Sequence, residues 1–392
     1  MSEGRLEWVI VGGGIHGVHL AVRLIASGRV ASGQLVIVDP GPRLLDTWRR
    51  CTGNTGMRFL RSPVVHHLDI DPWSLQRFAS TLDRPASELF AAPYARPATE
   101  LFEAHCDQVI ARYGLAERHL RGRVVGVDLT CDAATVRLDD GRELSAHQVI
   151  LAIGASEQPQ WPAWAVELRR QGAPVHHVFE PGFELCDDDW HGAVAVIGGG
   201  ITGAQVALRL AEAVSGPVHL VTRHPLREHT FDSDPGWIGP KNMRGFLAID
   251  DPDARRRTIT AARHRGSVTK EVHRPLRRRV RDGSIVLHRG EPHGIRSDGR
   301  LQLTVGDAQV AVDGVLLATG FAAQRPGGPM VDAIARSHGL SCATCGYPVV
   351  DHELRWHPRL YVSGPLAELS LGPVARNIIG ARRAAERIVG RA

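Results

Sequence analysis

The sequence has little lysine, and this scarcity limits what its positive charge can mean. Of 47 basic residues only Lys241 and Lys270 are lysines, so the formal net charge of +5 comes almost entirely from arginine. The short arginine runs 255–257 and 277–279 contain no interleaved aromatic residues, and no nucleic-acid-binding motif accompanies them. They are therefore predicted to be solvated surfaces, and no nucleic-acid partner is expected.

Long apolar runs and cysteine pairs are also scarce. No run reaches the roughly 18 apolar residues of a membrane span, and the first residues are polar, so we expect a cytoplasmic protein with no membrane partner. The six cysteines include one C-x-x-C, Cys342 to Cys345. A zinc site needs a second ligand pair, so no metal site is predicted and reduced thiols are expected. No Ser/His/Asp set or carboxylate pair stands out either.

What the sequence does contain is a repeated glycine turn. Two segments read G-x-G-x-x-G: Gly12-Gly13-Gly14-Ile15-His16-Gly17 and Gly198-Gly199-Gly200-Ile201-Thr202-Gly203. Each follows an apolar, β-branched run and precedes a helical stretch. Such glycines permit a tight strand-to-helix turn and a close approach to a diphosphate at the helix N-terminus. The repeat predicts an α/β fold with two Rossmann-like dinucleotide-binding domains.

The residue that closes the next strand distinguishes the two copies. Asp39, followed by Pro40, ends the strand at 35–38, and an acid there can accept hydrogen bonds from ribose hydroxyls. Arg223 stands at the corresponding place after the strand at 218–221. Arginine suits the 2′-phosphate of NADPH, whereas an acid would repel it. The first site is therefore predicted to take an unphosphorylated ribose and the second NADPH, against the alternatives of a turn acid and a surface arginine.

Other segments predict further elements. Helices are expected at 72–81, 98–113, 255–265 and 376–389, and strands at 123–129, 134–138, 147–153, 284–288, 301–305 and 309–318. The proline-rich stretch 158–162 is expected to be a crossing point between domains. The long loop 40–70 is expected to be functional, and 224–280 reads as irregular.

These features together resemble the two-dinucleotide-binding-domain flavoproteins. The segment from Asp313 through Leu317-Ala318-Thr319-Gly320-Phe321 to Pro326 is similar to the signature of flavin-dependent N-hydroxylating monooxygenases, which belong to class B. The stretches 57–61 and 72–78 also look like the region of those enzymes that lines flavin and substrate. The resemblance implies an FAD-binding domain at 1–160 and 305–392, and an NADPH-binding domain at 161–304 inserted in it.

The resemblance also implies a reaction. NADPH would reduce FAD, and O2 would react to a flavin C4a-hydroperoxide that transfers one oxygen atom to a soft nucleophile. The small-molecule substrate would be an amine or an amino-acid nitrogen. The redox cysteine pair of disulfide-reductase relatives has no counterpart, because Cys51 and Cys186 stand alone near the expected places.

Candidate site residues follow from the turns and from the resemblance. Catalytic candidates are Asn54 and Asn377 as hydrogen-bond partners, Arg61 for a substrate carboxylate and His66 as a proton relay near neutral pH. Besides both glycine turns, Asp39, Pro40 and Arg223, the predicted cofactor-binding residues are Trp48, Met57, Leu60, Val125, Ala152, Gly154, Thr319, Gly320, Gly364, Pro365, Leu371, Gly372 and Pro373. Each has a structural alternative, such as a turn former, a surface arginine or a packed histidine.

Two other functions stay open at this level. The first is an NAD(P)H-dependent flavoprotein reductase without oxygen insertion, and the second is a non-catalytic nucleotide-binding or redox-sensing module. The substrate and the oligomeric state also stay open; a homo-oligomer is compatible with the sequence.

Overall fold

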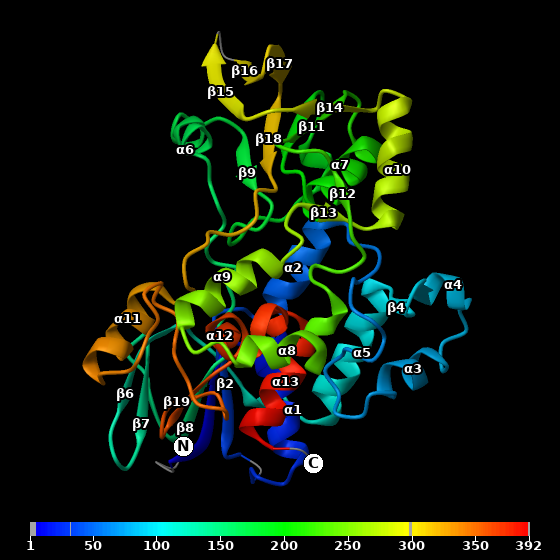
Figure 1. Cartoon of the computed structure of the whole chain (residues 1–392). Coiled ribbons are helices and arrows are strands. Elements are labelled where there is room, and N and C mark those ends of the chain that lie inside the picture. The colour runs from blue at the N-terminus through cyan, green and yellow to red at the C-terminus, as the bar shows by residue number, and fades with distance from the viewer. Residues whose placement is uncertain (1–4, 32, 298–299, 391–392) are drawn as a thin grey trace.

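The computed structural model describes residues 5–31, 33–297 and 300–390. Figure 1 shows two α/β units stacked on each other, with helices α8, α9 and α12 between them. Both chain ends of the described part lie at the base of the unit that holds β1. No helix within these described ranges is long and apolar enough to cross a membrane.

The first unit is built on a sheet with strand order β19-β20-β8-β1-β2-β5, and a β6–β7 hairpin extends it through β8. Its central strands β20, β8, β1, β2 and β5 run parallel, with Val9 opposite Val36 and Val149. The strands are β1 Leu6–Val11, β2 Leu35–Asp39, β5 His119–Arg121, β6 Val124–Leu129, β7 Ala134–Leu138, β8 Glu143–Leu151, β19 Arg355–His357 and β20 Leu360–Val362.

The second unit is a five-stranded parallel sheet with order β14-β11-β10-β18-β9. Its strands are β9 Val175–His177, β10 Val194–Ile197, β11 Val218–Thr222, β14 Ile285–Arg289 and β18 Gly314–Leu317. Because side chains alternate along a strand, Val194 and Val196 of β10 pack into one core with α7, while Ala195 and Ile197 pack into another core on the opposite face. Both faces are buried, which explains the continuous apolar run in the sequence.

Smaller sheets complete the strands: β3 Phe90–Ala91 with β4 Arg96–Pro97, β12 Arg227–Glu228 with β13 Ser267–Val268, and the antiparallel set β15 Pro292–Ser297, β16 Arg300–Val305 and β17 Ala308–Val312. The α-helices are α1 Ile15–Ala26, α2 Asp46–Thr55, α3 Ser74–Ala79, α4 Ala86–Leu89, α5 Thr99–Arg112, α6 Ala163–Arg170, α7 Ile201–Ala213, α8 Pro240–Leu247, α9 Pro252–Ala262, α10 Lys270–Arg281, α11 Gly328–Ser337, α12 Glu368–Leu371 and α13 Ile378–Ile388. Short 3-10 turns are η1 Ala116–Arg118, η2 Asp187–Asp189, η3 Pro235–Trp237, η4 Gly364–Ala367 and η5 Gly372–Arg376.

The predicted α/β fold with one unit inserted in the other is confirmed, because strands before and after the second unit share the first sheet. Most expected elements form within a few residues of their predicted bounds. The strand expected at 309–318 is two strands, β17 and β18. The helix expected from residue 376 begins at Ile378, because η5 precedes it.

The predicted boundary between residues 304 and 305 does not match the sheets. Strand β18 pairs with β10 of the second unit, with Val315 opposite Ala195. The return to the first sheet therefore begins after residue 317.

The expected crossing point at 158–162 is present. Pro159 and Phe321 form a β-bridge there, and Gln160 N donates to the Gly320 carbonyl at 2.9 Å. The chain thus leaves the first unit and returns to it through one paired crossing.

Candidate functional site

The first glycine turn is closed by backbone atoms that leave no room for side chains. Gly12 has φ +111°, and a Cβ on it would lie 2.7 Å from the Ala152 carbonyl oxygen. A Cβ on Gly17 would lie 1.8 Å from the oxygen of Gly12, whereas Gly14 has open space around it. Gly14 is also the N-cap of α1 and offers no side-chain cap, so the first N–H groups of α1 are free for an anion. This cradle fits a dinucleotide diphosphate.

Asp39 braces this turn. Its Oδ2 accepts a hydrogen bond from Gly13 N at 2.7 Å, and its Oδ1 accepts one from Gly41 N at 2.8 Å. Each carboxylate oxygen keeps a further lone pair, so a ribose hydroxyl can still donate to it. Pro40 is the residue between Asp39 and Gly41. The ribose role stays a prediction.

The second glycine turn repeats the first. Gly198 has φ +151° with a Cβ position 2.3 Å from the Ala318 oxygen, and a Cβ on Gly203 would lie 2.0 Å from the oxygen of Gly198. Gly200, the N-cap of α7, has no side-chain cap, and Gly266 Cα crosses 3.7 Å from its Cβ position. The other predicted residues of this turn are Gly199, Ile201 and Thr202. The second turn also fits a diphosphate.

The strand ends beside each turn correspond to each other. Ala152–Gly154 follows β8 beside the first turn, and Ala318–Gly320 follows β18 beside the second. Thr319 Oγ1 donates to the Gln160 carbonyl at 2.5 Å, so this threonine helps to join the two crossing segments. Arg223 is 72% exposed, and its Nε lies 3.9 Å from Glu291. Its phosphate role stays a prediction.

A cavity of about 560 Å³ lies where the two units meet. The first unit contributes residues from 15, 48–66, 94 and 374–379, and the second contributes 231–238. The structure brings seven predicted residues to its wall: Ile15, Trp48, Met57, Leu60, Arg61, His66 and Asn377. Trp48 Nε1 is buried and has no hydrogen-bond partner within the described part of the chain, which leaves a donor for a bound molecule.

The sequence missed one wall of this cavity. Phe231, Asp232 and Ser233 come from the segment that reads as irregular, and Tyr94 comes from the β3–β4 hairpin. Tyr94 has φ +69° and packs against Phe231 at a tilt of 39°, with ring centroids 5.4 Å apart. Ala95 beside it also has a positive φ, +47°. Positive φ is unusual for non-glycine residues, but this mark of the hairpin is visible only in the structure.

Asn54 does not line the cavity. It is 3% exposed, and its Nδ2 donates to the carbonyls of Val178 and Phe183 at 2.8 and 2.9 Å. Its Oδ1 accepts from Leu185 N at 2.9 Å. The amide is therefore engaged in joining the units, which argues against the predicted catalytic role.

Arg61 reaches the cavity, but its donors are largely occupied. Its Nε donates to the Thr230 carbonyl at 3.1 Å, and Nη2 donates to the His229 carbonyl at 2.8 Å. Nη2 also lies 3.3 Å from Ser267 Oγ. Arg61 positions the segment that carries Phe231 and does not present a free fork to a carboxylate.

His66 and Asn377 are both at the cavity wall. Burial lowers the pKa of His66 to about 4, with smaller effects from nearby Arg382 and His67. His66 is thus neutral at pH 7, which disfavours the expected relay through an imidazolium. Asn377 Nδ2 donates to Asp232 Oδ1 at 3.1 Å, and its own oxygen makes no hydrogen bond among the residues that the structure describes.

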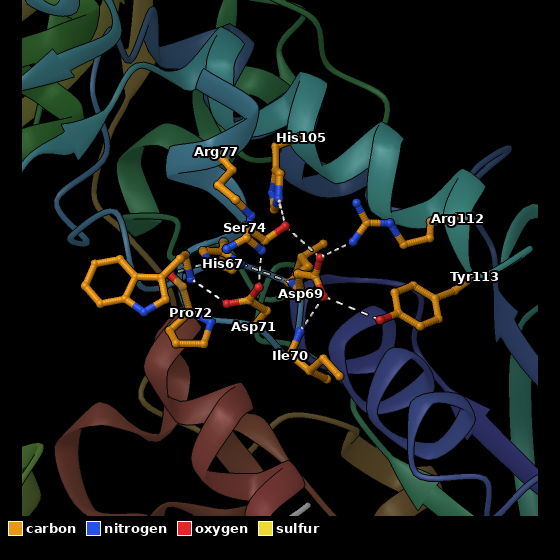
Figure 2. Close-up of polar contacts among 12 residues, drawn as sticks. His67, Asp69, Ile70, Asp71, Pro72, Ser74, Arg77, His105, Arg112 and Tyr113 are labelled. Atoms are coloured by element: carbon orange, nitrogen blue, oxygen red, sulfur yellow. Dashed lines mark hydrogen bonds and ion pairs between the residues drawn. The ribbon is translucent and has the colours of Figure 1, made fainter. Parts of the chain in front are cut away.

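The loop that carries Leu60 to His66 is anchored by a buried polar cluster (Figure 2). Asp69, 1% exposed, accepts from Ser74 Oγ at 2.6 Å and from Arg112 Nη1 at 2.7 Å. Ser74 Oγ also lies 2.9 Å from His105 Nε2. The serine bonds to both partners at once, so this is a structural network and not a hydrolytic triad. Arg382 of α13 clamps the same loop through the carbonyls of residues 67, 69 and 70.

A second cluster joins α9 of the second unit to α12. Glu368 is fully buried and contacts three arginines: it bonds to Arg256, accepts from Arg376 Nε at 2.9 Å and lies 3.8 Å from Arg263. Arg376 also donates to Tyr347 Oη at 2.9 Å and lines the cavity. Removing one partner of such a buried charge cluster typically costs about 3–5 kcal/mol, so this contact fixes the cavity wall firmly.

The remaining predicted residues lie elsewhere. Leu371, Gly372 and Pro373 pack against the second unit, since Gly372 faces Met243 and the Pro373 carbonyl accepts from Arg263 at 2.9 Å. They do not line the cavity between the units. Val125 on β6 is 48% exposed and also lies outside the lining. Gly364 has φ +62° and lies against His16, followed by the buried Pro365.

Among the described residues, no group of three or more His, Cys, Asp or Glu side chains could hold a metal ion. A hollow of about 620 Å³ in the second unit, beside Phe183 and Trp190, contacts neither glycine turn.

Comparison with known proteins agrees with this geometry. A model of FAD-NAD(P)-binding proteins matches residues 9–156, and the model of the pyridine nucleotide-disulphide oxidoreductases matches residues 83–386. No curated protein sequence matches.

Several solved structures share the fold. The FAD-bound cadaverine monooxygenase DfoA from Erwinia amylovora is 17% identical with a TM-score of 0.75, over 99% of this chain and 95% of that chain. The ornithine hydroxylase PvdA from Pseudomonas aeruginosa is 18% identical with a TM-score of 0.74, over 99% and 98%. The bacillithiol disulfide reductase Bdr from Bacillus cereus is 17% identical with a TM-score of 0.63, over 98% of each chain.

The predicted pair of dinucleotide cofactors is confirmed. Since the oxidoreductase model covers more than half of the residues, the chain belongs to the pyridine nucleotide-disulphide oxidoreductase family and is a flavoprotein enzyme that binds FAD and NAD(P).

Proposed function

We propose that the protein is an FAD- and NADPH-dependent monooxygenase that inserts one oxygen atom from O2 into an amine or amino-acid nitrogen. The observation that carries this proposal is the lining of the cavity between the units. None of the described residues that line it is a cysteine, so a disulfide-reductase reaction has no thiol among them. The likeness in fold to the cadaverine monooxygenase and the ornithine hydroxylase supports the same reading.

FAD, when bound, supplies the redox and oxygen chemistry, and the chain supplies binding, orientation and a dry site. Ile15, Trp48, Met57 and Leu60 form an apolar wall, and such a wall can keep water away from a bound substrate. An apolar wall also disfavours an ammonium ion, so a bound amine is held closer to its neutral, nucleophilic form.

The polar end of the cavity orients the substrate. The free oxygen of Asn377 and the remaining oxygen of Asp232 can accept hydrogen bonds from an amine N–H. His66 is neutral and can donate or accept one hydrogen bond without adding charge. Arg61 and Arg376 position this end through contacts with the protein itself.

The test is a screen of amines, amino acids and thioethers for substrate-stimulated NADPH oxidation, with product mass as the second readout. A true substrate raises the oxidation rate and yields a product heavier by one oxygen atom, which carries label from isotopic O2. Asn377→Ala should weaken this stimulation more than Asn54→Ala, which lies outside the cavity. An oxidation rate indifferent to every compound, with no oxygenated product, contradicts the proposal.

A reductase without oxygen insertion is the second candidate, favoured by the family model itself. Quinone and low-molecular-weight disulfide acceptors added anaerobically distinguish it. Rapid NADPH-dependent reduction of one of them, without oxygenated product in air, supports the reductase.

A further inference from the structure

The imidazole of His16 has one nitrogen without a partner. His16 is 8% exposed, and its Nδ1 lies 2.8 Å from Ser363 Oγ. Nε2 is buried and makes no hydrogen bond to any residue that the structure describes. A buried polar atom left unpaired costs about 1–3 kcal/mol, and nearly all such atoms in folded proteins have a partner. The missing partner is therefore expected to be a bound molecule.

His16 stands where the first dinucleotide must pass. It belongs to the first turn of α1, two residues after the open Gly14. Its ring atoms Cγ and Nδ1 lie 3.7 Å from the Cβ position of Gly364. Its neighbour Ile15 lines the cavity between the units, as does Asn377.

The sheet order gives the direction of the dinucleotide. Asp39 ends β2 on one side of β1, and Ser363 follows β20 on the other side, beyond β8. With the adenosine ribose at Asp39, the diphosphate crosses the glycine turn and the flavin half continues towards Ser363 and the cavity. His16 thus borders the flavin half.

The protein leaves this imidazole neutral and able to donate. Burial lowers the pKa of His16 to about 4, and the nearby Asn377 backbone, a hydrogen-bond acceptor for the ring, has a smaller opposite effect. This backbone does not meet hydrogen-bond geometry with Nε2, which is left without a partner among the described residues. When the Ser363 hydroxyl donates to Nδ1, the neutral ring carries its proton on Nε2. Diphosphate and ribityl oxygens both accept such a bond.

We propose that His16 Nε2–H donates a hydrogen bond to an oxygen of the flavin half of bound FAD. The glycine turn predicts backbone contacts only, so this side-chain contact is an additional determinant of flavin affinity. It depends on FAD binding and not on the reaction that follows.

The experiment measures the FAD dissociation constant of flavin-free protein by fluorescence titration. His16→Ala should weaken FAD binding by about ten-fold, the value of one buried hydrogen bond. His16→Gln keeps an N–H donor and should recover most of the affinity. ADP, used as a competitor that contains only the adenosine end, should bind equally well to all three proteins.

His19 offers a matched control on the same helix. It is 2% exposed, and its Nδ1 bonds to the Leu68 carbonyl at 2.7 Å. His19→Phe should lower the melting temperature and leave FAD affinity within about two-fold, as expected for a residue whose only role is structural.

Three results would overturn the proposal: unchanged FAD affinity in His16→Ala, equal losses with His16→Gln and His16→Ala, or a parallel loss of ADP affinity. A wild-type protein that takes up no FAD would also overturn it, together with the cofactor assignment. Absence of an oxygenated product would leave it untouched and would count against the proposed reaction alone.

Discussion

At the first glycine turn a Cβ on Gly12 would lie 2.7 Å from the Ala152 oxygen, and at the second a Cβ on Gly198 would lie 2.3 Å from the Ala318 oxygen. The backbone geometry is thus nearly duplicated. What differs is the residue after the neighbouring strand: Asp39 is held by two backbone N–H groups, whereas Arg223 is 72% exposed. The first site is braced before a cofactor arrives, and the second is open at its outer end. This difference suits one cofactor that stays bound and one that exchanges.

The largest effect is expected from alanine at the closing glycine of each turn. A Cβ on Gly17 or Gly203 would lie 1.8 or 2.0 Å from a backbone oxygen, so either change should cost about 3 kcal/mol or more locally. Gly17→Ala should abolish FAD content, measured by flavin absorbance. Gly203→Ala should retain FAD and lose NADPH-dependent flavin reduction. Gly245→Ala on α8, which has open space around it and lies outside both turns, is the control. Equal FAD loss in Gly17→Ala and Gly203→Ala would contradict the assignment of one cofactor to each turn.

Acid should act on the first unit before the second. Burial lowers the pKa of buried histidines to about 3 or 4, and five of these lie in the first unit: His16, His19, His66, His67 and His105. The second unit has one comparable residue, His177. Between pH 6.5 and 4 the unfolded chain binds protons that the folded chain does not, so stability falls as pH falls.

At pH 5, each such histidine lowers the free energy of unfolding by about 2 kcal/mol. FAD release, followed by fluorescence, should therefore precede loss of helical circular dichroism as pH drops from 7 to 5. His66→Gln, which removes one titrating group without removing a side-chain hydrogen bond, should make the release less steep. Release that is independent of pH over this range contradicts the assignment of buried neutral histidines.

The smallest effects sharpen the contrast between acid and arginine. Asp39→Ala removes two carboxylate hydrogen bonds and should raise the FAD dissociation constant about 30-fold, with KM for NADPH unchanged.

Arg223→Ala should raise KM for NADPH about five-fold and leave KM for NADH unchanged. A similar change for both nicotinamide cofactors would show that Arg223 does not contact the 2′-phosphate.

The turns could be predicted because their information is local. An apolar strand, three spaced glycines and a helix are contiguous in sequence, and Asp39 closes the next strand along the chain. The boundary predicted between residues 304 and 305 failed because strand pairing is not local information. Residues 315–317 and 149–151 have the same sequence pattern and the same place in their own sheets, so the sequence alone does not say which sheet each strand joins.

The cavity could be predicted only on one side. Trp48, Met57 and Arg61 stood out in a long loop, but Phe231 and Asp232 come from a segment without periodicity that is positioned by Arg61. Asn54 shows the converse. The sequence predicts it as a site residue because it is polar and lies in a segment expected to be a functional loop. Only the structure shows that it lies on α2 and that its amide bonds across the unit boundary.

The paired crossing at Pro159 and Phe321 has a mechanical consequence. Both covalent links between the units pass through one place, so the second unit can tilt about that place without stretching the chain. Away from it, the units are tied by non-covalent contacts of Arg61, Asn54 and the cluster around Glu368. Arg61 and Arg376 of these contacts also border the cavity. A tilt that widens the cavity would therefore have to break contacts that also hold the two units together.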